Sequence, residues 1–437
     1  MALFRSDTGT VFGGVEEAAF GTESSNFGQW WQAKALPDRS NLKQMYHEAD
    51  IIRSGNHVLP GVLGHKSDSS ISVESYLRGY KAGSAPTTHP TLASPLLSGG
   101  GNELMEVVAL AHAIGQISVS GGGATFSTVQ AAPAPSTTAF TVGAGDGVDY
   151  AVGQDIMVDV SATATANYEV RRIKSISTDA ITLEFPLSAA PAAGKSVFTG
   201  ITIFPTQQPQ VDSLSMRIQG DDFDGVSYWY HQILGARASA LSMKWDARGF
   251  IEANFDFDVA NWSREDAGAA PLYAADTGPV RVPLLGAKFQ YSVSGGAPVC
   301  MDAASMEFDV GLNTLRPVTA CGDNEGVLDS RFGISTPVMT VDPYKETEAE
   351  WMSAAGPFRS TTGVNFNFLA GSGPGTAVAF SISNGHLTDD PVLGDRDGLL
   401  INPLTVTPMV YTGDGTPGTD ERNNTTPIGA PWTITIF

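Results

Sequence analysis

Hydrophobic and polar residues alternate strictly between residues 250 and 259, in the run FIEANFDFDV. In an extended strand the apolar members fall on one face and the acidic or amide members on the other. These two sets are Ile251, Ala253, Phe255, Phe257 and Val259, and Glu252, Asn254, Asp256 and Asp258. Two earlier runs, 214–218 and 241–246, alternate in the same way. The pattern predicts consecutive amphipathic strands with one buried side and one negative side.

Helical spacing occurs in two places. A first helix is expected after Asn102, where apolar residues recur at i, i+3, i+4 and i+7 from Leu104. A second is expected to begin at Asp342 as N-cap, with Pro343 in its first turn, and to end at Gly356. The 48 Gly and 26 Pro of the chain otherwise favour many short strands joined by turns.

Strand-like runs surround both helices in the same order, which indicates an internal duplication, with two unrelated halves as the alternative. Between the first helix and residue 202 lies a block that opens with the low-complexity run AAPAPSTTAFTVGAGDG and continues as short alternating strands. It predicts a small all-β domain inserted in a surface loop. The expected fold is mainly β: a first module over residues 1–124 and 202–275, the insert over 125–201, and a second module over 276–437, each module with a flanking α-helix.

The net charge of the chain limits the classes of partner that it can bind. It has 46 acidic against 25 basic residues, a formal net charge of -21. Proteins that bind nucleic acid through its phosphates need clustered Lys and Arg, and this composition argues against such binding. A surface past which DNA must slide without sticking favours acidic groups. Solubility of an abundant protein is the other explanation.

Candidate chemistry is sparse. The seven histidines form no HExxH or HxH arrangement, the acids of GDDFDG lack calcium-loop spacing, and neither a phosphate loop nor a GxSxG elbow occurs. We expect no enzyme, no cofactor and no metal. Cys300 and Cys321 are expected to be free thiols in a reducing cytosol, with one bridge as the alternative. Without a signal-peptide pattern or a long apolar run, we expect no contact with a membrane.

Two segments, in their order along the chain, resemble the pattern of a known protein family. The opening VEEAAFGTESSNFGQWW contains Glu17, Ala18, Ala19, Phe20, Gly21 and Thr22. Residues 235–257 form an apolar strand, a short turn and a strand that ends in aromatic alternation. Together they resemble the tail tube proteins, or major tail proteins, of long-tailed, siphovirus-like bacteriophages, in which a Glu-Ala-Ala/Thr-x-Gly-Thr opening is common. The resemblance covers most of the chain outside the insert.

Membership in this family implies β-sandwich or barrel-like modules that close into rings, which stack into a hollow tube for DNA ejection into the host. The family commonly has six modules per ring. A chain with two modules then implies a homotrimeric ring with pseudo-sixfold symmetry, with a hexameric ring as the alternative. The implied partners are other copies of the chain, a tape-measure protein, and tail-tip and terminator proteins, while genomic DNA passes without specific binding. The implied location is the virion, assembled in the bacterial host cytoplasm.

The candidate site residues follow from this resemblance and the strand pattern. The candidate lumen-facing acids are Glu252, Asp256 and Asp258 in the first module and Glu307 and Asp309 in the second; a solvated outer face is the alternative. The candidate subunit-contact aromatics, because Trp and Tyr are enriched at interfaces, are Trp30, Trp31, Tyr228, Trp229 and Tyr230. Alternative functions are a β-rich adhesin or carbohydrate-binding protein, and another phage part such as a capsid decoration protein or the tube of a contractile particle.

Overall fold

A computed structural model shows a mainly β protein built from antiparallel strands, which confirms the expected class. The structure describes residues 11–17, 19–22, 31, 33–34, 37, 40–44, 46–48, 61–63, 69–79, 105–119, 126–163, 165–206, 213–221, 228–246, 249–267, 287–293, 295–315, 331–333, 335–344, 363–371, 373–388, 394–396, 398–401, 403–413 and 425–437.

Within these described ranges, sixteen strands form one large sheet. They are β1 (Val11–Glu16), β4 (Ser69–Tyr76), β5 (Gly115–Ser118), β12 (Ile201–Pro205), β13 (Leu214–Asp221), β14 (Tyr228–Asp246), β15 (Glu252–Val259), β16 (Asn261–Ala267), β17 (Lys288–Val293), β18 (Val299–Cys300), β19 (Ala303–Asp309), β22 (Val338–Pro343), β23 (Val364–Ala370), β24 (Val378–Leu387), β27 (Leu404–Pro408) and β28 (Trp432–Ile436). Three two-stranded pairs lie outside it: β2 (Tyr46–Glu48) with β3 (Gly61–Leu63), β20 (Thr314–Leu315) with β21 (Arg331–Phe332), and β25 (Gly394–Arg396) with β26 (Leu399–Ile401).

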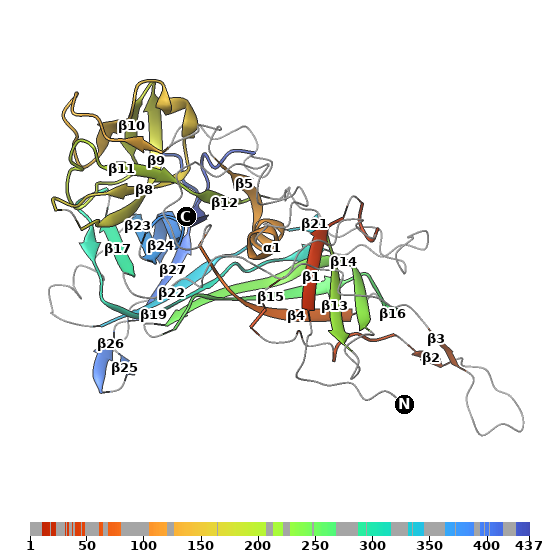
Figure 1. Cartoon of the computed structure of the whole chain (residues 1–437). Coiled ribbons are helices and arrows are strands. Elements are labelled where there is room, and N and C mark those ends of the chain that lie inside the picture. The colour runs from red at the N-terminus through yellow and green to blue at the C-terminus, as the bar shows by residue number, and fades with distance from the viewer. Residues whose placement is uncertain are drawn as a thin grey trace, which may run out of the picture.

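The large sheet folds over into two facing layers (Figure 1). The lower layer has the order β4-β15-β14-β19-β22-β27, the upper layer has the order β5-β12-β28-β24-β23-β17-β18, and pairing of β27 with β24 joins them. Aromatic rings of the two layers meet in the core: the ring centroid of Phe308 lies 4.4 Å from that of Phe380 and 4.9 Å from that of Trp432. Strands from both expected modules therefore share one core, and the internal duplication stays a prediction.

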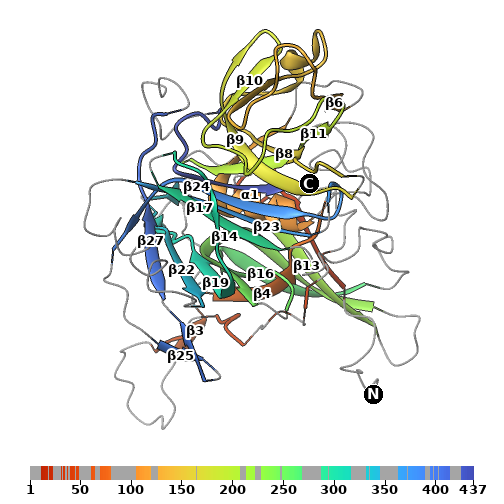
Figure 2. The ribbon, with the colours of Figure 1, turned by 90° about the vertical axis from the view of Figure 1, so that its left-hand side faces the viewer.

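Helix α1 (Met105–Ile114) lies between the layers, against β14 on one side and β5 and β12 on the other (Figures 1 and 2). All ten of its residues are buried, and it confirms the first expected helix, although Asn102 lies outside the described residues. Its polar side chains are paired. The Glu106 carboxylate accepts a hydrogen bond from the Arg78 guanidinium at 2.9 Å, and Nε2 of His112 accepts one from the Ala238 N–H at 3.0 Å.

The second expected helix does not begin where the sequence suggested. Asp342 and Pro343 belong to strand β22, so their assignment as N-cap and first turn is wrong. β22 pairs with β19 and β27, and this pairing satisfies the backbone groups that a helix start would have used. The Asp342 carboxylate accepts a hydrogen bond from the Ser305 hydroxyl at 2.7 Å instead of capping a helix. Residues 345–356 lie outside the described residues.

The long strand β14 changes partners at Gly235. Residues of β14 up to Ala236 pair with β13 and β16, and residues from Arg237 onward pair with β15 and β19. Gly235 has a φ of +61°, and a Cβ at this position would lie 2.6 Å from the Cβ of Ala260. A residue with a side chain would therefore be strained and crowded here.

The Glu17 carboxylate stabilises β14 at the point where its partners change. It accepts hydrogen bonds from the Gly235 N–H at 2.7 Å, from the hydroxyls of Ser213 at 2.6 Å and Ser215 at 2.8 Å, and from the Gly21 N–H at 2.6 Å. Glu17 is 3% exposed. The Glu and Gly of the opening motif thus connect the start of the chain to the middle of β14.

Replacing Glu17 by Ala is expected to lower the free energy of unfolding by at least about 3 kcal/mol, because three buried donors would be left without an acceptor, at about 1–3 kcal/mol each. Denaturant unfolding measures the loss. The matched control is Glu307→Ala, an exposed glutamate of β19, which should change stability by less than about 0.5 kcal/mol. Equal stabilities for the two variants would contradict the role given to Glu17.

Residues 127–199 form a second, six-stranded sheet with a core of its own, which includes Phe140, Ile156 and Ile173. Its order is β6 (Ser127–Thr128), β11 (Ser196–Thr199), β8 (Asp155–Asp159), β9 (Tyr168–Ser177), β10 (Ala180–Leu183) and β7 (Ala139–Thr141), and a 3-10 helix, η1 (Asp146–Asp149), precedes β8. Just after β6, the Gln130 N–H donates to the Thr141 carbonyl at 2.8 Å and closes the sheet on itself. We call residues 127–199 the small barrel.

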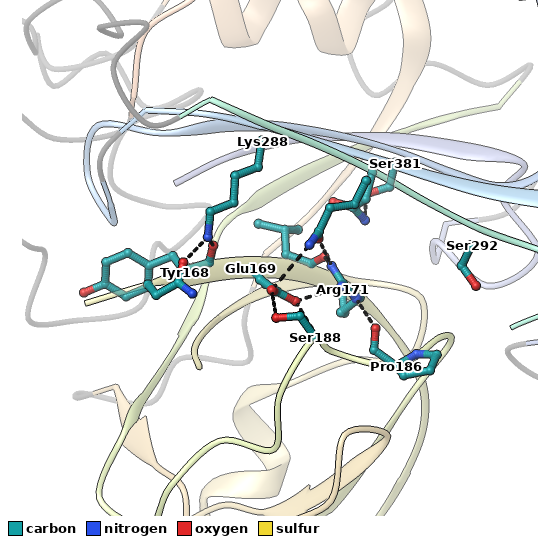
Figure 3. A network of polar contacts seen from close by, with 12 residues as sticks. Tyr168, Glu169, Arg171, Pro186, Ser188, Lys288, Ser292 and Ser381 are labelled. Carbon is teal, nitrogen blue, oxygen red and sulfur yellow. Dashed lines mark hydrogen bonds and ion pairs between the residues drawn. The ribbon is translucent and has the colours of Figure 1, made fainter. Parts of the chain in front are cut away.

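Charged side chains join the small barrel to the upper layer (Figure 3). The Arg171 guanidinium donates to Oε1 of Gln290 at 3.0 Å and to Oε2 of Glu169 at 2.8 Å. Burial lowers the pKa of Arg171 to about 10, which leaves it charged at neutral pH. Nζ of Lys288, from β17, donates to the Tyr168 carbonyl at 2.8 Å.

Arg172 and Asp155 make a second set of contacts, to β24 and to the last residues of the chain. The Arg172 guanidinium donates to the Ser383 hydroxyl at 2.9 Å, to the Ala430 carbonyl at 2.5 Å and to the Pro427 carbonyl. The Asp155 carboxylate accepts the hydroxyls of two β28 residues, Thr433 at 2.7 Å and Thr435 at 2.9 Å. Burial raises the pKa of Asp155. The small barrel is therefore fixed to the upper layer through polar groups that water does not reach.

Candidate functional surface

The lower layer presents an amphipathic sheet whose inner side is core and whose outer side is polar. Burial alternates with period two along β4, β15, β19 and β22, as strand geometry requires. The residues that point inward on β15 are Ala253, Phe255, Phe257 and Val259, all of them fully buried. The pattern at 250–259 therefore gave the correct buried side.

The five acids expected to line a lumen all lie on the outer side of this layer. Asp256, Glu307 and Asp309 are exposed, and Glu252 and Asp258 are half-buried. The two groups come from β15 and β19, which flank β14 on either side. We call the outer side of β4, β15, β14, β19 and β22 the acidic face.

Lys244 of β14 occupies the centre of one row across the acidic face. It pairs with Glu252 on one neighbouring strand and with Glu307 on the other. The sequence placed these two glutamates in different modules, and the strand register puts them on either side of one exposed lysine. Paired strands are about 5 Å apart, so the three side chains form a single charged row.

Two further acids of the face were missed by the sequence reasoning. Glu74 of β4 is exposed, and Asp342 of β22 is half-buried on the same side. The alternation in SISVES could have identified Glu74. The Ser72 hydroxyl, also on β4, donates to the Asp256 carboxylate at 2.5 Å.

Lys34 contributes the second lysine of the face. Its Nζ lies 2.9 Å from a carboxylate oxygen of Glu252 and 3.7 Å from one of Glu74. The hydrogen bond that Lys34 donates to the Glu252 carboxylate raises the pKa of Lys34. With Asp246 of β14, which is half-buried on the same side, eight carboxylates of the described residues share the face with two exposed lysines, while Arg237, which lies opposite Asp258, is 3% exposed. The face carries a clear excess of negative charge.

The candidate subunit-contact aromatics lie in different environments. Trp31 is 4% exposed in its own chain, packs edge-on against Phe255 and Phe257, and donates from Nε1 to the Ser75 hydroxyl at 2.9 Å. The expectation that Trp31 contacts another subunit is therefore corrected, because its ring fills the core between β4 and β15.

Tyr230 lies on β14, half-buried, with the Arg217 guanidinium 4.8 Å from its ring centroid. The backbones of Tyr228 and Trp229 lie in the same strand, whereas their side chains fall outside the described residues, as does all of Trp30. A role for these residues at subunit contacts stays a prediction.

No protein-family model matches this sequence. No curated protein is significantly similar to it either. The interpretation of the acidic face therefore depends on its own geometry and on the resemblance given above.

Within the described residues, no three His, Cys, Asp or Glu side chains are arranged to hold a metal ion. Cys300 is a free and exposed thiol, and Cys321 lies outside the described residues. Among the described helices, none is long and apolar enough to cross a membrane.

Proposed function

We propose that this chain is a structural virion protein that forms the tail tube of a long-tailed bacteriophage. The observation that carries the proposal is the acidic face: eight carboxylates of the described residues on one side of a wide sheet whose other side is core. In the proposed tube the acidic face lines the lumen, and the small barrel lies on the outside.

The mechanism is physical. DNA carries one negative charge per about 1.7 Å of helix axis, and a lumen that attracted phosphates would hold it. Carboxylates of like charge keep the phosphates away from the wall, so DNA moves through without being bound. The wall itself must not deform, and the two-layered core behind the acidic face, with Phe308 packed on Phe380 and Trp432, provides that rigidity.

Ring formation follows from the family resemblance. We propose two tail-tube-like modules, residues 1–124 with 202–275 and residues 276–437, with the insert over 125–201. Three copies would then complete a ring with pseudo-sixfold symmetry, and six copies are the alternative. Tape-measure, tail-tip and terminator proteins are the expected partners in the virion.

Negative-stain electron microscopy of the concentrated protein, together with its mass in solution, tests the proposal. We expect stacked rings or hollow tubes with threefold or sixfold end views, and a ring mass of three chains. A mass of six chains would keep the tube and reject the duplication. Monomers at every concentration, even with tail-tip protein added as an initiator, would contradict the proposed function.

A further inference from the structure

Lys288 and Asn167 bring an amine and a side-chain amide together from two parts of the fold. Lys288 begins β17 of the upper layer, and Asn167 directly precedes β9 of the small barrel. Nζ of Lys288 contacts Oδ1 of Asn167 and also donates to the Tyr168 carbonyl at 2.8 Å (Figure 3). The amide carbon, Cγ, carries both side-chain heteroatoms of Asn167, so it lies beside Nζ whichever way the amide is turned. The contact therefore places a nucleophile next to a carbonyl carbon.

The surroundings of Lys288 favour the neutral form of its amine. The side chain is half-buried, and this burial lowers the pKa of Lys288. The positive charge of Arg171 acts in the same direction. The acidic groups that face the amine, Glu169, Cys300 and Asp159, oppose both effects, but the net shift is downward. Because an amine attacks through its neutral form, a lysine with a lowered pKa is the more reactive nucleophile.

Glu169 lies on the same side of its strand as Asn167, because side chains two residues apart on a strand share a face. The Glu169 carboxylate reaches β17, where it accepts a hydrogen bond from Nε2 of Gln290 at 3.4 Å. Burial raises the pKa of Glu169, but the Arg171 charge and the hydrogen bonds from Ser188 outweigh it, so the pKa is lowered and the group is ionised. A fixed negative charge on this face stabilises the positive charge that develops on Nζ as it attacks.

The two reacting groups are positioned by elements that do not depend on their contact. β17 is held in the upper layer by pairing with β18 and β23. On the other side, the Asn167 N–H donates to the Asp159 carboxylate at 3.1 Å, and the Asn167 carbonyl accepts the Val160 N–H at 2.9 Å. Reactants held in place in this way reach effective concentrations of about 10⁵–10⁸ M, which supplies the rate that an amine and an amide lack in free solution.

We propose that Lys288 and Asn167 react to form an intramolecular isopeptide bond, which joins the small barrel covalently to the upper layer. A bond forms between Nζ and Cγ, the bond between Cγ and Nδ2 breaks, and one proton passes from Nζ to Nδ2, which leaves as ammonia. The step needs no oxidant, reductant or cofactor. Asn167 is exposed, so the ammonia can escape into solvent. This inference goes beyond the proposed function and does not rest on it, because both residues belong to one chain.

The mass of the intact protein tests the bond. We expect the purified chain, incubated at neutral to alkaline pH, to be lighter than its sequence by one ammonia. The variant Lys288→Arg keeps a positive charge but has no primary amine, and we expect it to have the full mass of its sequence. Lys195→Arg is the matched control and should keep the loss of ammonia. Nζ of Lys195 also bonds within the small barrel, to the Ser161 hydroxyl at 2.7 Å and to the Asp159 carboxylate at 3.1 Å.

Peptide mapping locates the bond. Digestion should release one branched peptide that joins the segment around Asn167 to the segment around Lys288, and Asn167→Ala should abolish it. In denaturing electrophoresis the wild-type chain should migrate differently from the Lys288→Arg chain. The two joined residues are 121 positions apart, so the bond closes a long loop that persists after unfolding.

Two results would overturn the proposal. One is a wild-type protein with the full mass of its sequence, which would leave an ordinary hydrogen bond between the two side chains. The other is a loss of ammonia that remains in the Lys288→Arg protein. Ring formation enters neither measurement, so failure of the isopeptide bond leaves the proposed function standing, and failure of the proposed function leaves the bond standing.

Discussion

Replacing Arg172 by Met is expected to lower the free energy of unfolding by about 3–5 kcal/mol and to loosen the small barrel from the upper layer. Met fills much of the same space but cannot donate a hydrogen bond. The carbonyls of Ala430 and Pro427 and the hydroxyl of Ser383 would lose their buried donor. The Asp155 carboxylate would lose the positive charge next to it, and the loss of one partner from a buried charged network costs about 3–5 kcal/mol.

Denaturant unfolding measures the loss, and hydrogen exchange locates it. We expect faster exchange in β8 and β9 of the Arg172→Met protein and little change in β15, which lies in the lower layer. Lys174→Met is the matched control, because it places the same side chain at an exposed position of β9 and should change stability by less than about 0.5 kcal/mol. Similar stability for the two variants would contradict the role given to Arg172.

The strands of the acidic face could be predicted because their signal is local. Burial on one side of a sheet requires alternation along the strand, and FIEANFDFDV has it without a break. The strand observed, β15, spans Glu252–Val259, and its burial alternates as the sequence indicated. The same reasoning correctly placed the first helix, where the apolar residues have period 3.6.

The neighbours of each strand could not be predicted, because pairing is not local. Glu252 and Glu307 are far apart in the sequence, and only the pairing of β14 with both β15 and β19 places them beside Lys244. Asp342 shows the opposite failure: Asp followed by Pro is a good local signal for a helix start, but pairing of β22 with β19 prevails over it.

The burial of certain charged and aromatic residues also could not be predicted from the sequence. The segment NYEVRRIKSIS contains two arginines and a lysine in a short space, yet Arg171 and Arg172 are fully buried and Lys174 is exposed. The difference is made by Gln290 and Ser383, which belong to distant strands and accept their hydrogen bonds. For a similar reason the sequence predicts a subunit contact for Trp31, since its acceptor, Ser75, lies in a strand that the sequence does not connect to it.

Changing Glu252, Asp256, Glu307 and Asp309 together to Lys is expected to give tubes that assemble but retain DNA. Each replacement changes the charge by two units, and the row through Lys244 becomes positive from β15 to β19. Phosphates would then replace bound counterions at each ring, and affinity of this kind grows steeply with the number of contacts. We expect DNA ejection from particles to slow at least about tenfold at low salt, and to recover as salt is raised.

The rate of DNA release from particles that carry the variant, and the binding of DNA to purified tubes, measure this effect. The matched control replaces the same four residues by Gln or Asn, which removes the repulsion without adding attraction and should slow ejection far less. Because only a surface that meets DNA during ejection can produce this salt-dependent delay, the comparison separates a lumen wall from a solvated outer face. Intact tubes that release DNA at the wild-type rate with four lysines in each chain would place the acidic face on the outside.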